Sequence, residues 1–148
     1  MIYLLRHGDA EPDLGEGDAA RRLTAKGEKQ SRIAGLAIAR LGYEVGTCLA
    51  SPRVRALDTA RIACLALGIE PEVSLPIGDG SYEADDLAIG RGNVLLVGHE
   101  PVLSMEVARL TGASVKMKKG GLAVLEPGTL RVLLRPAELA AIATSPAQ

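Results

Sequence analysis

The chain has 148 residues, enough for one domain with a single hydrophobic core. Hydrophobic residues make up 47% and charged residues 24% of the sequence, as in ordinary globular proteins. Trp and Phe are absent, Tyr occurs three times, and the formal net charge is −1. This composition argues against functions that need aromatic stacking platforms or a broad basic surface for nucleic acid.

The first predicted strand is the apolar run Ile2 to Leu5, which stops at Arg6 and is too short for a signal peptide or a membrane span. A polar, glycine-containing loop without helical periodicity follows, over about residues 9–23. Thr24 is the expected N-cap of a helix that ends at Gly42. The predicted apolar face of this helix consists of Ile33, Leu36, Ala37 and Leu41.

Residues 47–50 are the next strand candidate. Ser51-Pro52 then predicts a helix start, because serine can cap the first N–H groups and proline needs no donor there. Gly68 ends this helix, and its expected face consists of Val54, Leu57, Ala60, Cys64 and Leu67. A short helix is predicted near residues 82–89.

The clearest buried strand covers residues 93–97, and a helix stopped by Gly112 follows it. Strands near 121–126 and 129–135, separated by Pro127-Gly128, predict a hairpin, and a last helix is expected at 136–143. Alternating strands and helices followed by a hairpin predict a mostly parallel, mixed sheet. We therefore expect residues 1–148 to form one α/β domain, a three-layer α/β/α sandwich.

The two cysteines, Cys48 and Cys64, stand apart and form no Cys-x-x-Cys pair. They are expected to be buried thiols in a reducing cytoplasm rather than a disulfide or a metal site. The two histidines have no cysteine or carboxylate at ligand spacing, so neither a metal nor another cofactor is predicted.

Chemically capable side chains follow three of the predicted strands. Arg6 and His7 end the first strand, Arg53 and Arg55 lie just after the second, and His99 follows the strand at 93–97. Because ligands of open α/β sheets bind beyond the carboxyl ends of the strands, these groups are expected to meet. Neutral imidazole is a nucleophile and guanidinium matches phosphate oxygens, so the sequence predicts a phosphoryl-transfer pocket. Spacing alone does not decide which of the two later arginines faces it.

Four segments, in this order, resemble the histidine phosphatase superfamily, whose fold is phosphoglycerate mutase-like. They are Leu5-Arg6-His7-Gly8-Asp9-Ala10, the Arg-x-Leu-Thr-x-x-Gly segment within 21–27, Ser51-Pro52-Arg53-Val54-Arg55-Ala56 with the residues up to Ala60, and Val97-Gly98-His99-Glu100-Pro101. The short length and the second segment are most similar to SixA-type phosphohistidine phosphatases. The resemblance covers about residues 1–102.

The resemblance implies a role for each matching residue. His7 would be the nucleophile that becomes phosphorylated, and Arg6 would bind the phosphoryl oxygens. In the Ser-Pro-x-x-Arg-Ala pattern the arginine before alanine is Arg55, and His99 would be the second histidine of the pocket. Gly8 and Arg21 are expected to contribute to substrate binding.

The general acid is left open by the sequence. Many superfamily members use a carboxylate between the second and third motifs, where this chain offers Asp79, Glu83, Asp85 and Asp86. SixA-like proteins generally lack a clear acid at that place, which suits a substrate whose leaving group is an imidazole.

The resemblance leaves three alternative functions open. The first is a metal-independent phosphatase acting on phosphohistidine of a protein, with neither a nucleic acid nor a membrane as partner. The second is a small-molecule phosphatase or phosphoglycerate-mutase-like enzyme, and the third is a non-catalytic phosphate-binding module. Lys116, Lys118 and Lys119 are expected to lie in a solvated loop, the alternative being a docking patch for an acidic phosphoprotein.

Overall fold

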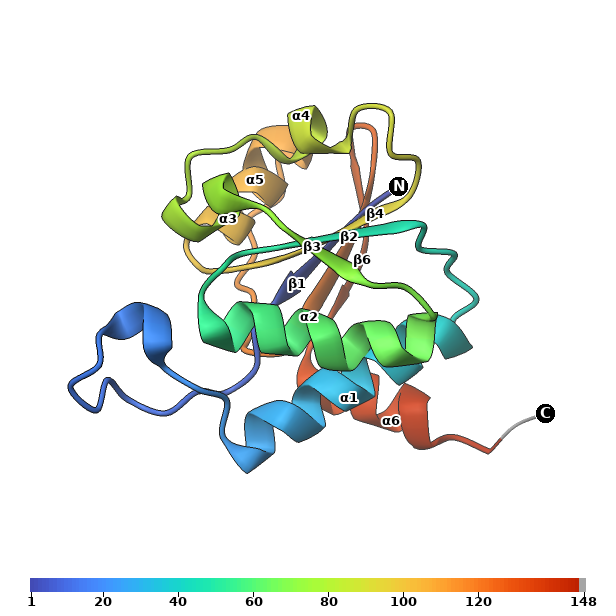
Figure 1. Ribbon diagram of the computed structural model, residues 1–148. Helices are drawn as coiled ribbons and strands as arrows, with labels where there is room; N and C mark the ends of the chain where they lie inside the picture. Colours follow the sequence, from blue (N-terminus) through green and yellow to red (C-terminus); the bar gives the residue numbers. More distant parts are fainter. Residues whose placement is uncertain (147–148) are drawn as a thin grey trace.

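Residues 1–146 are described by the computed structural model, in which one six-stranded sheet lies between two layers of helices (Figure 1). The strands are β1 (Ile2–Arg6), β2 (Thr47–Ala50), β3 (Pro71–Val73), β4 (Val94–Gly98), β5 (Leu122–Glu126) and β6 (Thr129–Leu134). Their order across the sheet is β3-β2-β4-β1-β5-β6. The first four strands pair in parallel and the last two are antiparallel, so the predicted mixed sheet is confirmed.

Six α-helices cover the two faces of the sheet. One layer contains α1 (Ala25–Arg40), α2 (Val54–Leu67) and α6 (Pro136–Thr144). The opposite layer contains α3 (Leu75–Asp79), α4 (Ala84–Ala88) and α5 (Val102–Thr111), as Figure 1 shows. The three-layer arrangement that the sequence predicts is therefore correct.

The central strands supply both halves of the core. All five residues of β4 are buried, as are the three middle residues of β1. Successive side chains of a strand point to opposite faces of the sheet. Tyr3 and Leu5 accordingly pack with the α1, α2 and α6 layer, whereas Leu4 packs with the α3, α4 and α5 layer.

Two short elements were not predicted from the sequence. Strand β3 has three residues, two of them exposed, and pairs only with β2 at the edge of the sheet. Helix α3 has five residues, one of which is buried. Segments this short carry too little periodicity to separate them from a loop. The predicted loop at 9–23 also contains one 3₁₀ turn, η1 (Asp18–Ala20).

The start of α2 differs from the prediction. The helix begins at Val54 with Arg53 as the N-cap, so Ser51 does not cap it. The Ser51 hydroxyl instead accepts a hydrogen bond from the backbone N–H of Arg53 at 3.2 Å, within the turn before the helix. Serine readily forms such local turns, and these compete with helix capping.

The buried face of α1 also differs from the prediction. Leu36 and Leu41 are 45% and 39% exposed, because the helix packs through small residues instead. A Cβ atom on Gly35 would lie 2.3 Å from the carbonyl oxygen of Ala63 in α2. The buried residues of α1 are Gly27, Ser31, Ala34, Gly35, Ala37 and Ile38. Close backbone approach, rather than a row of large apolar side chains, joins α1 to α2.

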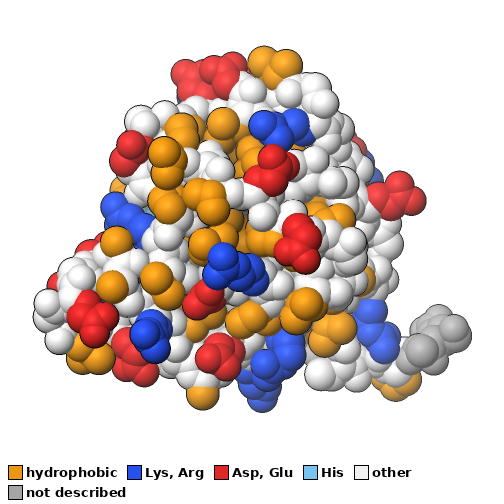
Figure 2. All heavy atoms as spheres, in the orientation of Figure 1, with side chains coloured by type: hydrophobic (Ala, Val, Ile, Leu, Met, Phe, Trp, Pro, Cys, Tyr) orange, Lys and Arg blue, Asp and Glu red, His pale blue; other side chains and the backbone are white. Residues whose placement is uncertain are grey.

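No helix in the part of the chain that the structure describes is long and apolar enough to cross a membrane. Acidic and basic side chains are interspersed on the face shown in Figure 2, with no broad patch of either sign. Cys48 and Cys64 are free and buried, as the sequence predicts.

The contact between α1 and α2 can be tested with Gly35→Ala. Alanine favours a helix by about 1 kcal/mol over glycine, but its methyl group must separate the two backbones. Overpacking of this kind costs about 1–3 kcal/mol, so we expect a net fall in the free energy of unfolding in urea. Leu36→Ala, one residue away on the exposed side, is the control and should have the smaller effect; the reverse ranking would contradict this packing.

Candidate active site

The pairing of β1 with β4 brings the two histidines together. Arg6 lies opposite Gly98 in the parallel register, and the N–H of His7 donates to the carbonyl of Gly98 at 3.2 Å. The imidazole rings of His7 and His99 consequently lie with their centroids 5.2 Å apart and their planes tilted by 53°. The convergence expected at the strand ends is present in the structure.

His7 is oriented by its own neighbour. Its Nδ1 lies 2.7 Å from the backbone carbonyl oxygen of Gly8, and a carbonyl can only accept, so Nδ1 carries the hydrogen. The other ring nitrogen, Nε2, then holds a free lone pair. This is the tautomer that a histidine nucleophile needs.

Burial keeps both histidines neutral. The side chain of His7 is 5% exposed, and burial lowers its pKa to about 4 against the opposing effect of the Gly8 hydrogen bond, with Arg55 and Arg6 lowering it further. Burial, together with the nearby His7 and Arg55, lowers the pKa of His99 to about 3. Near pH 7 the His7 lone pair is therefore available for attack on an electrophile.

Arg6 and Arg55 each donate hydrogen bonds from Nη atoms to the protein, whereas their Nε atoms have no partner in the described chain. Nη1 of Arg6 donates to the carbonyl of Met117 at 2.9 Å. Both Nη atoms of Arg55 donate to Asp18. Within residues 1–146, the buried Nε atoms of both arginines and Nδ1 of His99 have no hydrogen-bond partner. Unpaired buried polar atoms are costly, and here an oxyanion between the histidines and arginines would satisfy them.

His99 has one further partner that the sequence did not predict. Its Nε2 lies 2.8 Å from the hydroxyl oxygen of Ser51. Ser51 belongs to the Ser-Pro segment of the third motif, in which the sequence predicts for the serine itself only a helix cap. Its buried hydroxyl orients the second histidine instead.

Gly8 supports the site through its backbone and its lack of a side chain. Its N–H donates to the hydroxyl of Thr59 at 3.0 Å, and that hydroxyl donates to the carbonyl of Arg55 at 2.7 Å. A Cβ atom on Gly8 would lie 2.5 Å from the carbonyl oxygen of Gly27. Thr59 thus links the loop after His7 to α2, another role that sequence reasoning missed.

The Arg-x-Leu-Thr-x-x-Gly segment fastens the loop after His7. The hydroxyl of Thr24 accepts from the N–H of Gly27 at 3.0 Å and donates to the carboxylate of Asp9 at 2.8 Å. A Cβ atom on Gly27 would meet the Asp9 carbonyl oxygen at 2.0 Å. The predicted N-cap at Thr24 is confirmed. Through Thr24 and Gly27 this part of the motif contacts Asp9, in the loop after His7.

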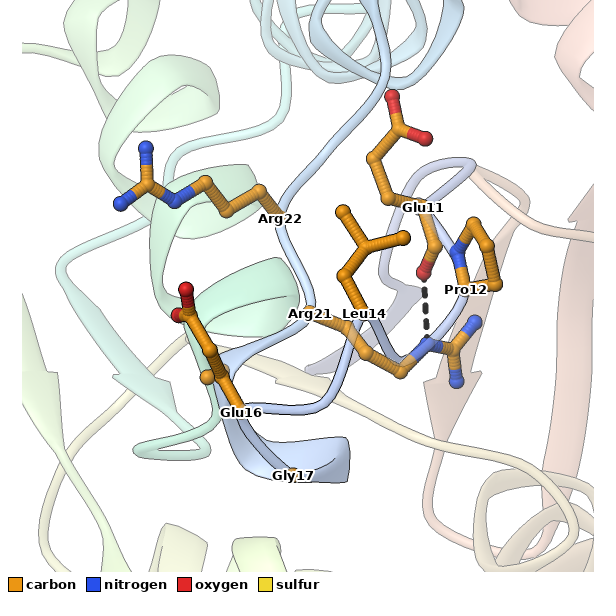
Figure 3. A pocket seen from close by; sticks show the side chains of 8 residues that line it. Glu11, Pro12, Leu14, Glu16, Gly17, Arg21 and Arg22 are labelled. Atoms are coloured by element: carbon orange, nitrogen blue, oxygen red, sulfur yellow. Dashed lines mark hydrogen bonds between the residues drawn. The ribbon is translucent and has the colours of Figure 1, made fainter.

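Arg21 faces its own loop. Its Nε donates to the carbonyl of Glu11 at 2.8 Å, as Figure 3 shows, and its Nη1 pairs with Asp18 at 3.1 Å. Arg21 and Arg22 line a pocket of about 300 Å³ within this loop. In the described chain Arg21 makes no direct hydrogen bond to Arg55. The two arginines are linked through Asp18, whose carboxylate accepts from both.

One of the four candidate acids lines the same pocket as His99. Asp79 lines a pocket of about 170 Å³ together with Arg53 and His99. Hydrogen bonds from Ser81 hold the pKa of this carboxyl below its usual value, so it is ionised near pH 7. Glu83 and Asp85 pair with Arg109, and Asp86 is exposed.

The loop between α5 and β5 closes the site from the other side. The N–H of Gly120 lies 3.0 Å from the carbonyl oxygens of both Arg6 and His7. Lys119 is half-buried and pairs with Asp9 at 3.4 Å, and its charge contributes to the lowered pKa of His7. Lys116 and Lys118 are exposed, as predicted.

Comparison with known sequences matches this chain to one family. The model of the histidine phosphatase superfamily (branch 1) matches residues 2–76. An uncharacterised protein of Picosynechococcus sp. strain PCC 7002 is 32% identical over 145 residues, covering 88% of this chain and 87% of that protein. A mitochondrial serine/threonine-protein phosphatase, Pgam5 of Drosophila ananassae, is 43% identical over 61 residues, which cover 41% of this chain and 21% of that protein.

Solved structures share the fold over nearly the whole chain. The protein histidine phosphatase SixA complexed with tungstate superimposes with a TM-score of 0.79 and 25% identity, covering 93% of this chain and 98% of that one. A SixA homologue from Agrobacterium tumefaciens gives 0.78 and 25%, covering 91% and 97%. The fold and the paired histidines thus define a phosphoglycerate mutase-like α/β protein. The chain belongs to the histidine phosphatase superfamily, as its motifs predicted.

The two histidines are the only ones in the chain, so their titration can be followed directly by NMR. In phosphate-free buffer their imidazole signals should stay constant from about pH 8 to 5.5, unlike free histidine with a pKa of about 6.5. Inorganic phosphate should raise both midpoints, because an anion favours the protonated form. The unfolded chain takes up these protons near the ordinary pKa, so acidification from about pH 6.5 toward 4 should also lower the free energy of unfolding. A midpoint near 6.5 for His7 without phosphate would contradict this account.

Proposed function

We propose that this protein is a metal-independent phosphatase that removes the phosphoryl group of phosphohistidine from a protein through a covalent intermediate on His7. One observation carries the proposal: the lone pair of a neutral, buried imidazole lies among arginine and histidine nitrogens that lack partners within residues 1–146. A nucleophile beside donors poised for an anion suits phosphoryl transfer.

The reaction has two steps. Nε2 of His7 attacks the phosphorus in line, and an N–P bond forms to His7. The N–P bond to the substrate imidazole breaks, and its electron pair stays on the imidazole nitrogen. Water then attacks the phosphorus of phospho-His7, an O–P bond forms, and the N–P bond breaks with its electron pair returning to Nε2 of His7. The protons of the water stay on inorganic phosphate or pass to solvent. One difficult hydrolysis thereby becomes two easier transfers.

The charge of the transferring group is met by fixed donors. The free Nε–H groups of Arg6 and Arg55 are buried and preorganised, so they need no rearrangement when charge spreads over the equatorial oxygens. We assign His99 the tautomer in which the Ser51 hydroxyl donates to its Nε2, so that Nδ1 carries the hydrogen and is a third donor. Gly8 contributes to substrate binding through its backbone carbonyl, which holds His7 in place. Arg21 contributes to substrate binding at the entrance of the site.

The acid requirement favours phosphohistidine over phosphate esters. An alkoxide leaving group must be protonated by the enzyme as it departs, whereas the imidazole of phosphohistidine takes its proton from water beforehand and leaves neutral. Asp79, the candidate acid beside His99, is ionised near pH 7 and cannot give a proton. The 25% identity to SixA, itself a protein histidine phosphatase by name, supports the same substrate class.

The cellular setting follows from the same features. Cys48 and Cys64 are free thiols, which suits a reducing cytoplasm. The mixed surface charge suits a phosphorylated protein or a small phosphate ester as partner, rather than nucleic acid.

His7→Ala should abolish turnover, because the nucleophile is lost. When native protein is mixed with substrate and quenched in alkali, phosphate that is stable to base and labile to acid should be found on His7. His99→Ala is the matched comparison: it should still form the intermediate, with the rate reduced by roughly 10²–10³-fold through loss of one preorganised donor. Trapping on His99, or full activity of His7→Ala, would contradict the proposed mechanism.

The substrate class can be tested with purified protein and a panel of phosphohistidine protein, phosphoserine and sugar phosphates. The specificity constant should be highest for phosphohistidine, because its leaving group needs no acid. A clear preference for sugar phosphates or phosphoserine would support a small-molecule phosphatase instead. An aryl phosphate, whose leaving group is stable without protonation, should also be hydrolysed; no turnover of any substrate would indicate a phosphate-binding module.

A further inference from the structure

One carboxylate is shared by three arginines beside the candidate active site. Oδ2 of Asp18 lies 2.8 Å from Nη1 of Arg53 and 3.1 Å from Nη2 of Arg55, and Oδ1 lies 3.1 Å from Nη1 of Arg21. The backbone carbonyl of Asp18 also accepts from Nη1 of Arg55 at 2.9 Å. These contacts tie the loop at 9–23 to the start of α2.

The contacts with Asp18 hold the edge of Arg55 formed by its two terminal nitrogens. A guanidinium group has five N–H donors in a rigid plane. Asp18 takes donors from both Nη atoms, while the Nε–H is buried without a partner within the described chain. Arg55 is 5% exposed, so its plane cannot turn to offer another edge. Arg6 follows the same pattern, with Nη1 on the Met117 carbonyl and Nε free.

We propose that Asp18 is a positioning residue, which holds the far edge of Arg55 so that its Nε–H edge faces the phosphoryl group. The inference rests on the proposed function. Asp18 does not itself touch the substrate; it acts through Arg55. A carboxylate beside an anion site would by itself repel phosphate, but here three guanidinium groups surround it and offset its charge.

The opposite interpretation makes an opposite prediction. If Asp18 occupied the phosphate position on Arg55 and had to be displaced, its removal would increase activity. The unpaired Nε–H argues against this, since an anion bonded to it would leave both Asp18 contacts in place. Hydrogen bonds from Arg21 and Arg55 also lower the pKa of Asp18, so it remains an ionised acceptor at neutral pH.

Asp18→Asn should therefore lower kcat for phosphohistidine protein by roughly 10–100-fold, the cost of a misplaced catalytic group, with a much smaller change in KM. Asp13→Asn is the matched control. Asp13 lies in the same loop and accepts from the N–H groups of Gly15 and Gly17, but no arginine contact is found for it in the described chain. It should leave kcat within about twofold.

A double-mutant cycle separates positioning from general loosening of the loop. Lysine at position 55 keeps the charge but lacks the guanidinium plane, so it has no edge for Asp18 to orient. In the Arg55→Lys background, Asp18→Asn should change the single-turnover rate of His7 phosphorylation by less than about threefold. Equal fold-losses in both backgrounds would assign Asp18 a merely structural role and overturn the proposal.

NMR gives a readout that does not depend on turnover. Titration of the native protein with inorganic phosphate should shift the Nε–H signal of Arg55, which Arg55→Lys identifies by its disappearance. In Asp18→Asn this shift should be reduced, and in Asp13→Asn it should be retained. A native protein that forms no phospho-His7 would refute the proposed function. A fully active native protein whose Asp18→Asn variant is as active as Asp13→Asn, or more active, would refute only the role of Asp18.

Discussion

The parallel pairing of β1 with β4 is the constraint on which the candidate site depends. Both strands are almost entirely buried, and their register places Arg6 against Gly98. The residues that follow each strand must then leave the sheet at the same edge, which puts His7 and His99 within contact range. A shift of the register by one residue would turn every side chain of β1 to the other face, so core packing and site geometry are fixed together.

Around this pairing, the protein keeps several polar groups in a state that opposes stability. Neutral His7 is buried and neutral His99 is partly buried, and three arginine and histidine nitrogens are without partners in the described chain. The network of Thr59, Ser51, Asp18 and the Met117 carbonyl compensates by fixing the remaining donors and acceptors of the same side chains. Unsatisfied groups at an active site are typical of preorganisation, because the stability they cost is recovered when a charged ligand binds.

The sequence predicted those features that follow from strong local patterns. The apolar runs gave β1, β2 and β4, and their polar ends located His7, His99 and the pair Arg53 and Arg55, of which the family resemblance selected Arg55. It could not predict the supporting residues, because Asp18, Ser51 and Thr59 are ordinary polar residues whose roles arise from distant contacts. Asp18, for example, meets Arg55 across 37 positions of sequence. The buried face of α1 was missed for a related reason: its contact depends on Gly35, and a missing side chain leaves no hydrophobic signal.

The position of β1 in the sheet has a consequence for synthesis of the chain on the ribosome. Its two neighbours are β4 and β5, which begin at Val94 and Leu122, so β1 has no partner until the chain has been made as far as β4. Until then the apolar residues of β1 stay unpaired in the nascent chain, exposed to solvent or bound by a chaperone. His7 therefore precedes in the chain both strands that pair with β1, and the site around it is assembled only after β4 and β5 have been made.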